Sequence, residues 1–145
     1  MKWFTGALIV LFLLWCAPAD AARRCKVVSV TDGDTFTCTM TPPLWGPYRN
    51  TIIRVADIDT PESLKTYAKC DKELRLGLIA KAEAKRRLPI GSTVSIVWTG
   101  EKEFHNRVLA RVKMPDGADW AGEMIRLGMA RPYTSDNLTK QSWCN

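Results

Sequence analysis

The chain has 145 residues, of which 46% are hydrophobic and 25% are charged, and its formal net charge is +6. This length suits one domain with a core of its own, and the absence of repeats or biased segments excludes repeat and low-complexity proteins. The basic balance favours polyanionic partners such as nucleic acid, although a basic protein that binds none has the same charge.

The first 21 residues have the features of an export signal. Met1-Lys2 is a short positive region, residues 7–16 are an unbroken apolar run, and Ala19-Asp20-Ala21 offers small residues at the spacing that signal peptidase accepts. The apolar run is shorter than the ~20 residues of a transmembrane span. We therefore expect residues 1–21 to be a signal peptide that is removed.

A lipoprotein signal is the alternative, with Cys16 as the acylated residue. The residue before it is a tryptophan, where lipoprotein signals carry a small residue, which disfavours this alternative. The prediction is a single domain over residues 22–145, secreted or periplasmic, monomeric, and without stable membrane association once the signal is cleaved.

Loss of the signal leaves four cysteines, Cys25, Cys38, Cys70 and Cys144. An even number in an exported chain predicts two disulfides. Four cysteines permit three pairings, and the sequence does not choose among them. A zinc site is the rival interpretation, but the chain has no Cys-x-x-Cys pair and His105 is its only histidine, which disfavours zinc.

The first half of the domain has the pattern of β-structure. Residues 25–39 predict a strand pair around the turn dipeptide Asp32-Gly33. Residues 41–50 contain three prolines and predict a loop. Residues 51–58 are rich in β-branched side chains and predict a strand, which Pro61 stops.

The second half alternates helices and strands. Residues 71–88 predict a helix capped by Asp71, with an apolar face and a basic, solvated face on the opposite side. The residues expected on the apolar face are Leu74, Leu78, Ile79 and Ala82. Strands are expected at 93–98 and 108–112, before a short helix over 120–127. Asp119 caps that helix and Gly128 ends it, which completes a small α+β or β-barrel domain.

Carboxylates and arginines are grouped in two segments of this domain. The Asp-Gly-Asp-Thr segment at 32–35 is explained by a hairpin turn alone, and it fails the EF-hand pattern. Asp59 and Glu62, however, flank a Thr-Pro break at a strand end, where a loop can aim carboxylates inward. Oxygen ligands suit a hard cation such as Ca²⁺ or Mg²⁺, and arginines such as Arg54 suit phosphate oxygens. Together they are the parts of a phosphodiesterase.

Strand alternation places Arg54 and Asp59 on opposite faces. If both serve one site, the chain must bend or bulge between residues 57 and 59. Without such a site, Arg54 is a solubilising residue at a strand edge and Glu62 an exposed loop acid. We expect Asp57 to face solvent.

The combined pattern resembles the thermonuclease family, that is, staphylococcal nuclease-like domains. It consists of residues 32–35, Arg54, then Asp59-Thr60-Pro61-Glu62, and Arg107, in matching order and spacing. The resemblance extends over about residues 25–133. It implies an OB-fold, a five-stranded barrel with two to three attached helices, and Ca²⁺-dependent hydrolysis of phosphodiesters in DNA and/or RNA.

The resemblance also implies the roles of individual residues. Asp34 and Asp59 would bind Ca²⁺ through their carboxylates, and Thr60 through its backbone carbonyl. Glu62 would be the general base, or would position the attacking water.

Arg54 and Arg107 would bind the scissile phosphate and offset charge that grows in the transition state. The chain departs from the family at His105-Asn106, where a Tyr-Gly pair usually precedes the arginine. Tyr133 is the loose counterpart of the tyrosines that contact the nucleotide, one position out of register.

Two other classes of function compete with a nuclease. One is a catalytically decayed OB module that binds nucleic acid without cleaving it, although such a binder has no use for Glu62 and the two metal-binding acids. The other is a disulfide-stabilised exported protein with no nucleic-acid role, which only the signal and the cysteines support.

Overall fold

A computed structural model describes residues 22–41, 50–102, 107–134 and 142–145. The expected signal peptide at 1–21, most of the proline-rich loop and the His105-Asn106 pair lie outside these residues. Within them, no helix is both long enough and apolar enough to cross a membrane.

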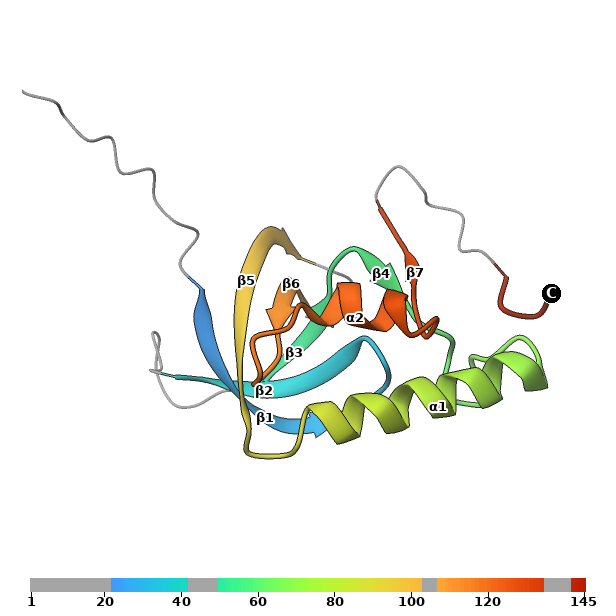
Figure 1. Ribbon diagram of the computed structural model, residues 1–145, viewed down its shortest axis with the longest axis horizontal. Helices are drawn as coiled ribbons and strands as arrows, with labels where there is room; N and C mark the ends of the chain where they lie inside the picture. Colours follow the sequence, from blue (N-terminus) through green and yellow to red (C-terminus); the bar gives the residue numbers. More distant parts are fainter. Residues whose placement is uncertain (1–21, 42–49, 103–106, 135–141) are drawn as a thin grey trace, which may run out of the picture.

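Five strands close into a barrel (Figure 1). They are β1 (Arg23–Val30), β2 (Thr35–Thr41), β3 (Asn50–Val55), β5 (Thr93–Lys102) and β6 (Val108–Lys113). The order around the barrel is β1-β2-β3-β6-β5, and all neighbours are antiparallel except β3 and β6, which run parallel. This closed five-stranded barrel with its helices confirms the predicted OB-type α+β fold.

The barrel interior follows from alternation along the strands, because successive side chains point to opposite faces. Each strand contributes apolar side chains to one core that are at most 1% exposed, among them Val27, Phe36, Ile53, Ile96 and Val112. The described strands therefore share one hydrophobic core, and loops at the rim of the barrel remain to carry polar residues.

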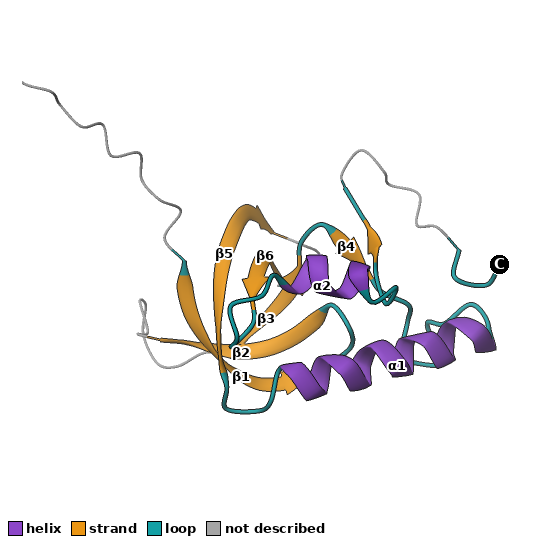
Figure 2. Cartoon of the chain, in the orientation of Figure 1, coloured by secondary structure: helices purple, strands orange, loops and turns teal. Residues whose placement is uncertain are grey.

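Two helices and a small second sheet lie outside the barrel (Figure 2). Helix α1 (Asp71–Arg87) and helix α2 (Trp120–Arg126) are joined by an ion pair of 2.8 Å between Arg87 and Glu123. Strands β4 (Ile58–Asp59) and β7 (Arg131–Pro132) pair with each other. The expected cap of α2 is confirmed, since Asp119 accepts a hydrogen bond from the Gly122 N–H at 2.8 Å.

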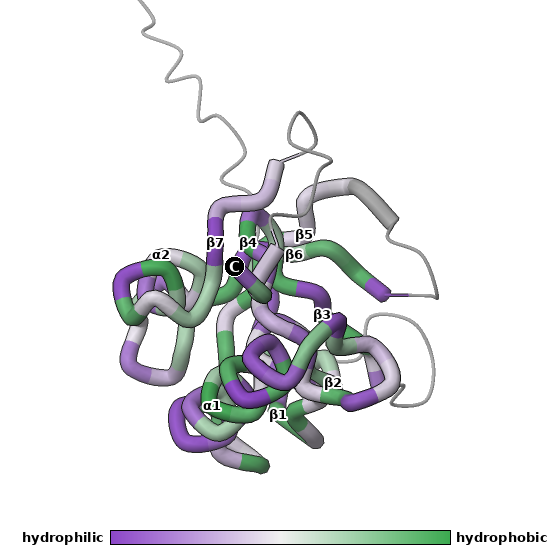
Figure 3. Tube along the Cα trace, turned by 90° about the vertical axis from the view of Figure 1, so that its right-hand side faces the viewer, coloured by the Kyte–Doolittle hydropathy of each residue, from purple (hydrophilic) through white to green (hydrophobic). Residues whose placement is uncertain are grey.

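The predicted apolar face of α1 is wrong. Leu78 and Ile79 are 51% and 53% exposed, and hydrophilic and hydrophobic residues alternate along this helix (Figure 3). The residues that α1 buries are Glu73, Gly77, Ala80 and Ala84. The helix lies so close to the rest of the protein that small side chains fit at the contact, whereas larger aliphatic ones point outward.

The cap of α1 also differs from the prediction. Cys70, in extended conformation, is the N-cap, and its Sγ accepts a hydrogen bond from the Glu73 N–H at 3.4 Å. Asp71 instead lies in the first turn, where its negative charge still favours the helix dipole.

Both predicted disulfides are present. Cys25 and Cys38 join β1 to β2, with Cα atoms 5.6 Å apart. Cys70 and Cys144 join the start of α1 to the C-terminus across 74 residues, with Cα atoms 6.0 Å apart. The C-terminus therefore lies beside the N-terminal end of α1 (Figure 1).

Candidate active site

The turn between β1 and β2 is held in place by both helices and by a loop. The Trp120 indole Nε1 of α2 donates a hydrogen bond to the Gly33 carbonyl at 3.0 Å. A Cβ at Gly33 would lie 3.0 Å from Ala80 of α1 and 3.0 Å from Thr60. Glycine is therefore the residue that lets the turn approach so closely, and the approach places Asp34 next to Thr60.

A turn between β3 and β4 brings Arg54 and Asp59 to the same place. Asp57 adopts a left-handed φ of 68°, which reverses the chain after β3. The Arg54 guanidinium Nη2 then donates to the Ile58 carbonyl at 3.1 Å and reaches Asp59 Oδ1 at 3.4 Å. The predicted bend is confirmed, and Asp57 is exposed as expected, paired with Arg111 at 3.1 Å.

Asp34, Arg54 and Asp59 form a buried charge cluster. Their exposed fractions are 6%, 7% and 6%, and Arg54 makes an ion pair with each carboxylate. Asp34 also accepts hydrogen bonds from the Thr60 N–H at 2.9 Å and from the Thr35 hydroxyl at 3.1 Å. Buried charges need such partners, since desolvation of an unpaired ion costs several kcal/mol.

Asp32 belongs to the same cluster, although the sequence indicates only a turn residue there. Burial, and next the negative charge of Asp34, raise the pKa of Asp32 to about 7. The ordinary use of Asp-Gly in turns conceals this second role. An additional positive charge nearby would favour the ionised form of Asp32.

A cavity of about 220 Å³ opens over the cluster. All residues predicted for the site contribute to its lining, namely Asp34, Arg54, Asp59, Thr60, Glu62, Arg107 and Tyr133. Glu62, Arg107 and Tyr133 are half-buried, so they are accessible from the cavity. Asp32, Thr35 and Pro61 complete it. The cavity therefore combines two guanidiniums, which suit phosphate oxygens, with carboxylates, which suit a cation or a proton.

Gly77 in α1 sets the position of Glu62. A Cβ at Gly77 would lie 2.2 Å from the Glu62 carbonyl oxygen and 2.4 Å from its carbonyl carbon. This contact cannot be predicted from the sequence, because a glycine inside a helix pattern is tolerated at a cost of about 1 kcal/mol. The helix thus supports the backbone of the loop that carries Glu62.

We expect Gly77→Ala to lower both kcat, by about tenfold, and the thermal midpoint. Helix propensity alone predicts the opposite sign for stability, a gain of about 1 kcal/mol, but the new methyl group must displace the Glu62 backbone. Activity assays and thermal unfolding measure the two effects. Ala82→Gly, at an exposed position of α1, is the matched control and should cost stability alone. A more stable Gly77→Ala protein with full activity would contradict the assigned role.

Comparisons with known proteins agree with this geometry. The family model described as staphylococcal nuclease homologue matches residues 52–143, which is more than half of the chain. An Escherichia coli protein described as an uncharacterized endonuclease is 27% identical over 129 residues, covering 89% of this chain and 73% of the relative. A Haemophilus influenzae protein with the same description is 27% identical over 127 residues, covering 88% and 62%.

Proposed function

The chain belongs to the staphylococcal nuclease family, a family of phosphodiester hydrolases, and from that premise we propose that it is an exported, Ca²⁺-dependent nuclease acting on DNA and/or RNA. One observation carries the proposal. Arg54, Arg107 and Glu62 line a single cavity over the buried carboxylates of Asp34 and Asp59. A nucleic-acid-binding module without activity would have no need for carboxylates there, since they repel a phosphate backbone.

The donor set of the cavity fits Ca²⁺. It offers oxygen ligands alone, from the Asp34 and Asp59 carboxylates and the Thr60 carbonyl, and hard cations prefer oxygen. Within the described residues, no three side chains of Asp, Glu, His or Cys form a metal-binding group. When bound, Ca²⁺ would supply Lewis-acid stabilisation of phosphate charge.

The protein's own side chains divide the rest of the chemistry. Arg54 and Arg107, which both line the cavity, would bind the scissile phosphate, because a planar guanidinium can grip two of its oxygens. Glu62 is half-buried at the cavity, where its carboxylate can accept a proton from the attacking water. Tyr133, whose backbone N–H donates to the Asp57 carbonyl at 2.9 Å, can contact the nucleotide.

Export and monomeric state are part of the same proposal. The two disulfides support an oxidising compartment, either the periplasm or the exterior of the cell. Residues 1–21 would be the cleaved signal, and residues 22–145 the single mature nuclease domain.

Cleavage assays test the proposal. We expect the protein spanning residues 22–145 to degrade single-stranded DNA or RNA with Ca²⁺ and to stop when a chelator is added. As a control, excess Ca²⁺ added after the chelator should restore activity, which would show that the chelator had not inactivated the protein. Cleavage that continues in chelator would remove Ca²⁺ from the proposal. Salt-sensitive binding without cleavage would instead support the decayed OB module.

A further inference from the structure

A second cavity lies beside the one that holds the candidate catalytic residues. Its volume is about 150 Å³, and it shares Asp59, Thr60 and Glu62 with the first. Its other lining residues come from the loop after Glu62, the first turn of α1 and the C-terminal tail, and they are Tyr67, Lys69, Glu73, Ser142 and Trp143. We call it the tail cavity. Because the two cavities share residues, a substrate whose phosphate occupies the first can extend into the second.

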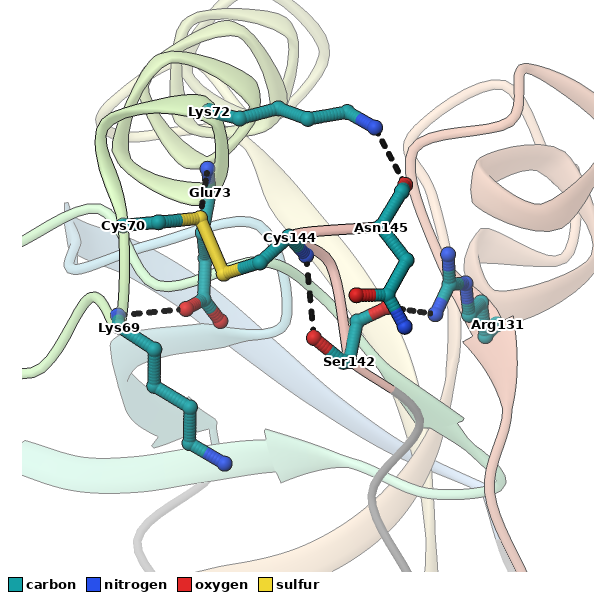
Figure 4. The surroundings of a disulfide bond; sticks show 8 residues. All are labelled: Lys69, Cys70, Lys72, Glu73, Arg131, Ser142, Cys144 and Asn145. Atoms are coloured by element: carbon teal, nitrogen blue, oxygen red, sulfur yellow. Dashed lines mark hydrogen bonds between the residues drawn. A yellow bond between two sulfur atoms is a disulfide. The ribbon is translucent and has the colours of Figure 1, made fainter.

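The tail side of this cavity is firmly held (Figure 4). Cys144 is bonded to Cys70 at the start of α1, and Arg131 donates a hydrogen bond to the Ser142 carbonyl at 2.8 Å. The Arg131 guanidinium carbon also lies 3.9 Å from the centre of the Trp143 ring. Trp143 is consequently only 7% exposed. The tail cavity is therefore preformed, which lowers the entropic cost of binding a ligand.

The tail cavity has the groups that bind a nucleobase. Tyr67 is 67% exposed and offers an aromatic face for stacking. The Trp143 indole Nε1 is buried, and it has no hydrogen-bond acceptor in the described part of the chain. The indole ring is therefore a packed wall of the cavity, and its N–H is not exposed to a ligand.

Electrostatics favour a base over a phosphate in this position. Three carboxylates line the tail cavity, from Asp59, Glu62 and Glu73, against the single ammonium of Lys69. Asp59 is ion-paired to Arg54 and assigned to Ca²⁺, so the negative charge that remains for a ligand is that of Glu62 and Glu73. The amino groups of a neutral base can donate hydrogen bonds to such carboxylates. Lys69 is exposed and can approach the backbone of the same nucleotide from the rim.

We propose that the tail cavity is the subsite for the base of a nucleotide adjoining the scissile phosphate. The proposal rests on the proposed nuclease function and adds to it a specific binding element. Tyr67 stacks on the base, and Trp143, held by the neighbouring Cys144–Cys70 disulfide, is part of the same lining. The substrate class that this subsite favours is single-stranded, because a base within a duplex is not available for stacking on a side chain.

Kinetics on designed oligonucleotides test the subsite. The substrate is a short single-stranded DNA with one cleavable linkage and an abasic unit on its 5′ side, on its 3′ side, or on neither. With all bases present, we expect Tyr67→Ala to raise KM about tenfold, which corresponds to about 1.4 kcal/mol and lies within the measured range for base stacking. Tyr67→Phe, which keeps the aromatic ring, should restore most of the affinity that Tyr67→Ala loses.

The abasic substrates show which base the subsite binds. When the abasic unit replaces the base that occupies the subsite, wild type and Tyr67→Ala should have equal KM. An unchanged KM for Tyr67→Ala on the full substrate, or a tenfold effect that persists on both abasic substrates, would overturn the subsite.

A second measurement does not depend on cleavage. In ¹⁵N-labelled wild-type protein, titration with a phosphorothioate-linked dinucleotide should shift the indole N–H signal of Trp143, assigned with Trp143→Phe. In the Cys70→Ser/Cys144→Ser variant the tail is released, and the same dinucleotide should shift that signal less. An indole signal that stays in place in wild type would overturn the subsite, even for a protein that cleaves DNA. A shift in a protein that cleaves nothing would support the subsite and reject the nuclease.

Discussion

Replacing Glu62 by glutamine should lower kcat by about 10²–10⁴-fold, the range that a positioned general base typically contributes. Glutamine has nearly the same shape, so the backbone contact between residue 62 and Gly77 is retained. What disappears is the carboxylate that we propose accepts a proton from water. Under the proposed roles, the two arginines of the cavity bind the phosphate, so KM should change much less than kcat. Steady-state kinetics with Ca²⁺ present measure both constants.

Asp57→Asn is the matched control for this substitution. It removes one carboxylate charge from the turn that precedes Asp59, but the side chain is exposed and lies outside the cavity lining. Asparagine also tolerates the left-handed backbone of that position. Near-normal kcat is expected for the control. Glu62→Gln with wild-type kcat would exclude the carboxylate as base, and an equal loss in both variants would point to a general effect of charge.

The residues that the sequence and the family resemblance assign to one site do line one cavity, whereas their roles stay predictions. Strand alternation alone would put Arg54 and Asp59 on opposite faces, so a shared site requires a bend between them. Asp57 provides that bend with a φ of 68°. The turn at Gly33 and the cap at Asp119 are likewise local signals that the structure reproduces. Such features depend on a few neighbouring residues, so one sequence is enough to expect them.

Other features depend on contacts between segments that are far apart in the sequence. The apolar pattern of α1 suggested Leu78 and Ile79 for its buried face, yet close approach of the helix selects Gly77, Ala80 and Ala84. Cys70 and Cys144 are 74 residues apart in the sequence, and their pairing requires the fold to bring them together. The spacing of the cysteines does not predict that pairing. The tail cavity follows from that pairing. It was therefore not predictable from sequence.

Replacing Arg54 by methionine should cost both activity and stability. Without a cation, Arg54 is the countercharge of two buried carboxylates, Asp34 and Asp59. Removing one partner of a buried ion pair typically costs about 3–5 kcal/mol, because the remaining charges stay desolvated. Loss of a preorganised phosphate donor should in addition lower kcat by about 10²–10³-fold. Urea unfolding in chelator and kinetics in Ca²⁺ measure the two losses separately.

Arg107→Met is the comparison that separates the two roles of Arg54. Arg107 is half-buried at the same cavity, so its replacement should lower kcat similarly but reduce the free energy of unfolding much less. Added Ca²⁺ should stabilise Arg54→Met more than wild type, since the cation would supply the missing countercharge; at 100 times the Kd a ligand contributes about 2.7 kcal/mol. Equal stability losses in the two variants would reject Arg54 as the countercharge. If Ca²⁺ failed to stabilise the Arg54→Met variant, Asp34 and Asp59 would be rejected as ligands of Ca²⁺.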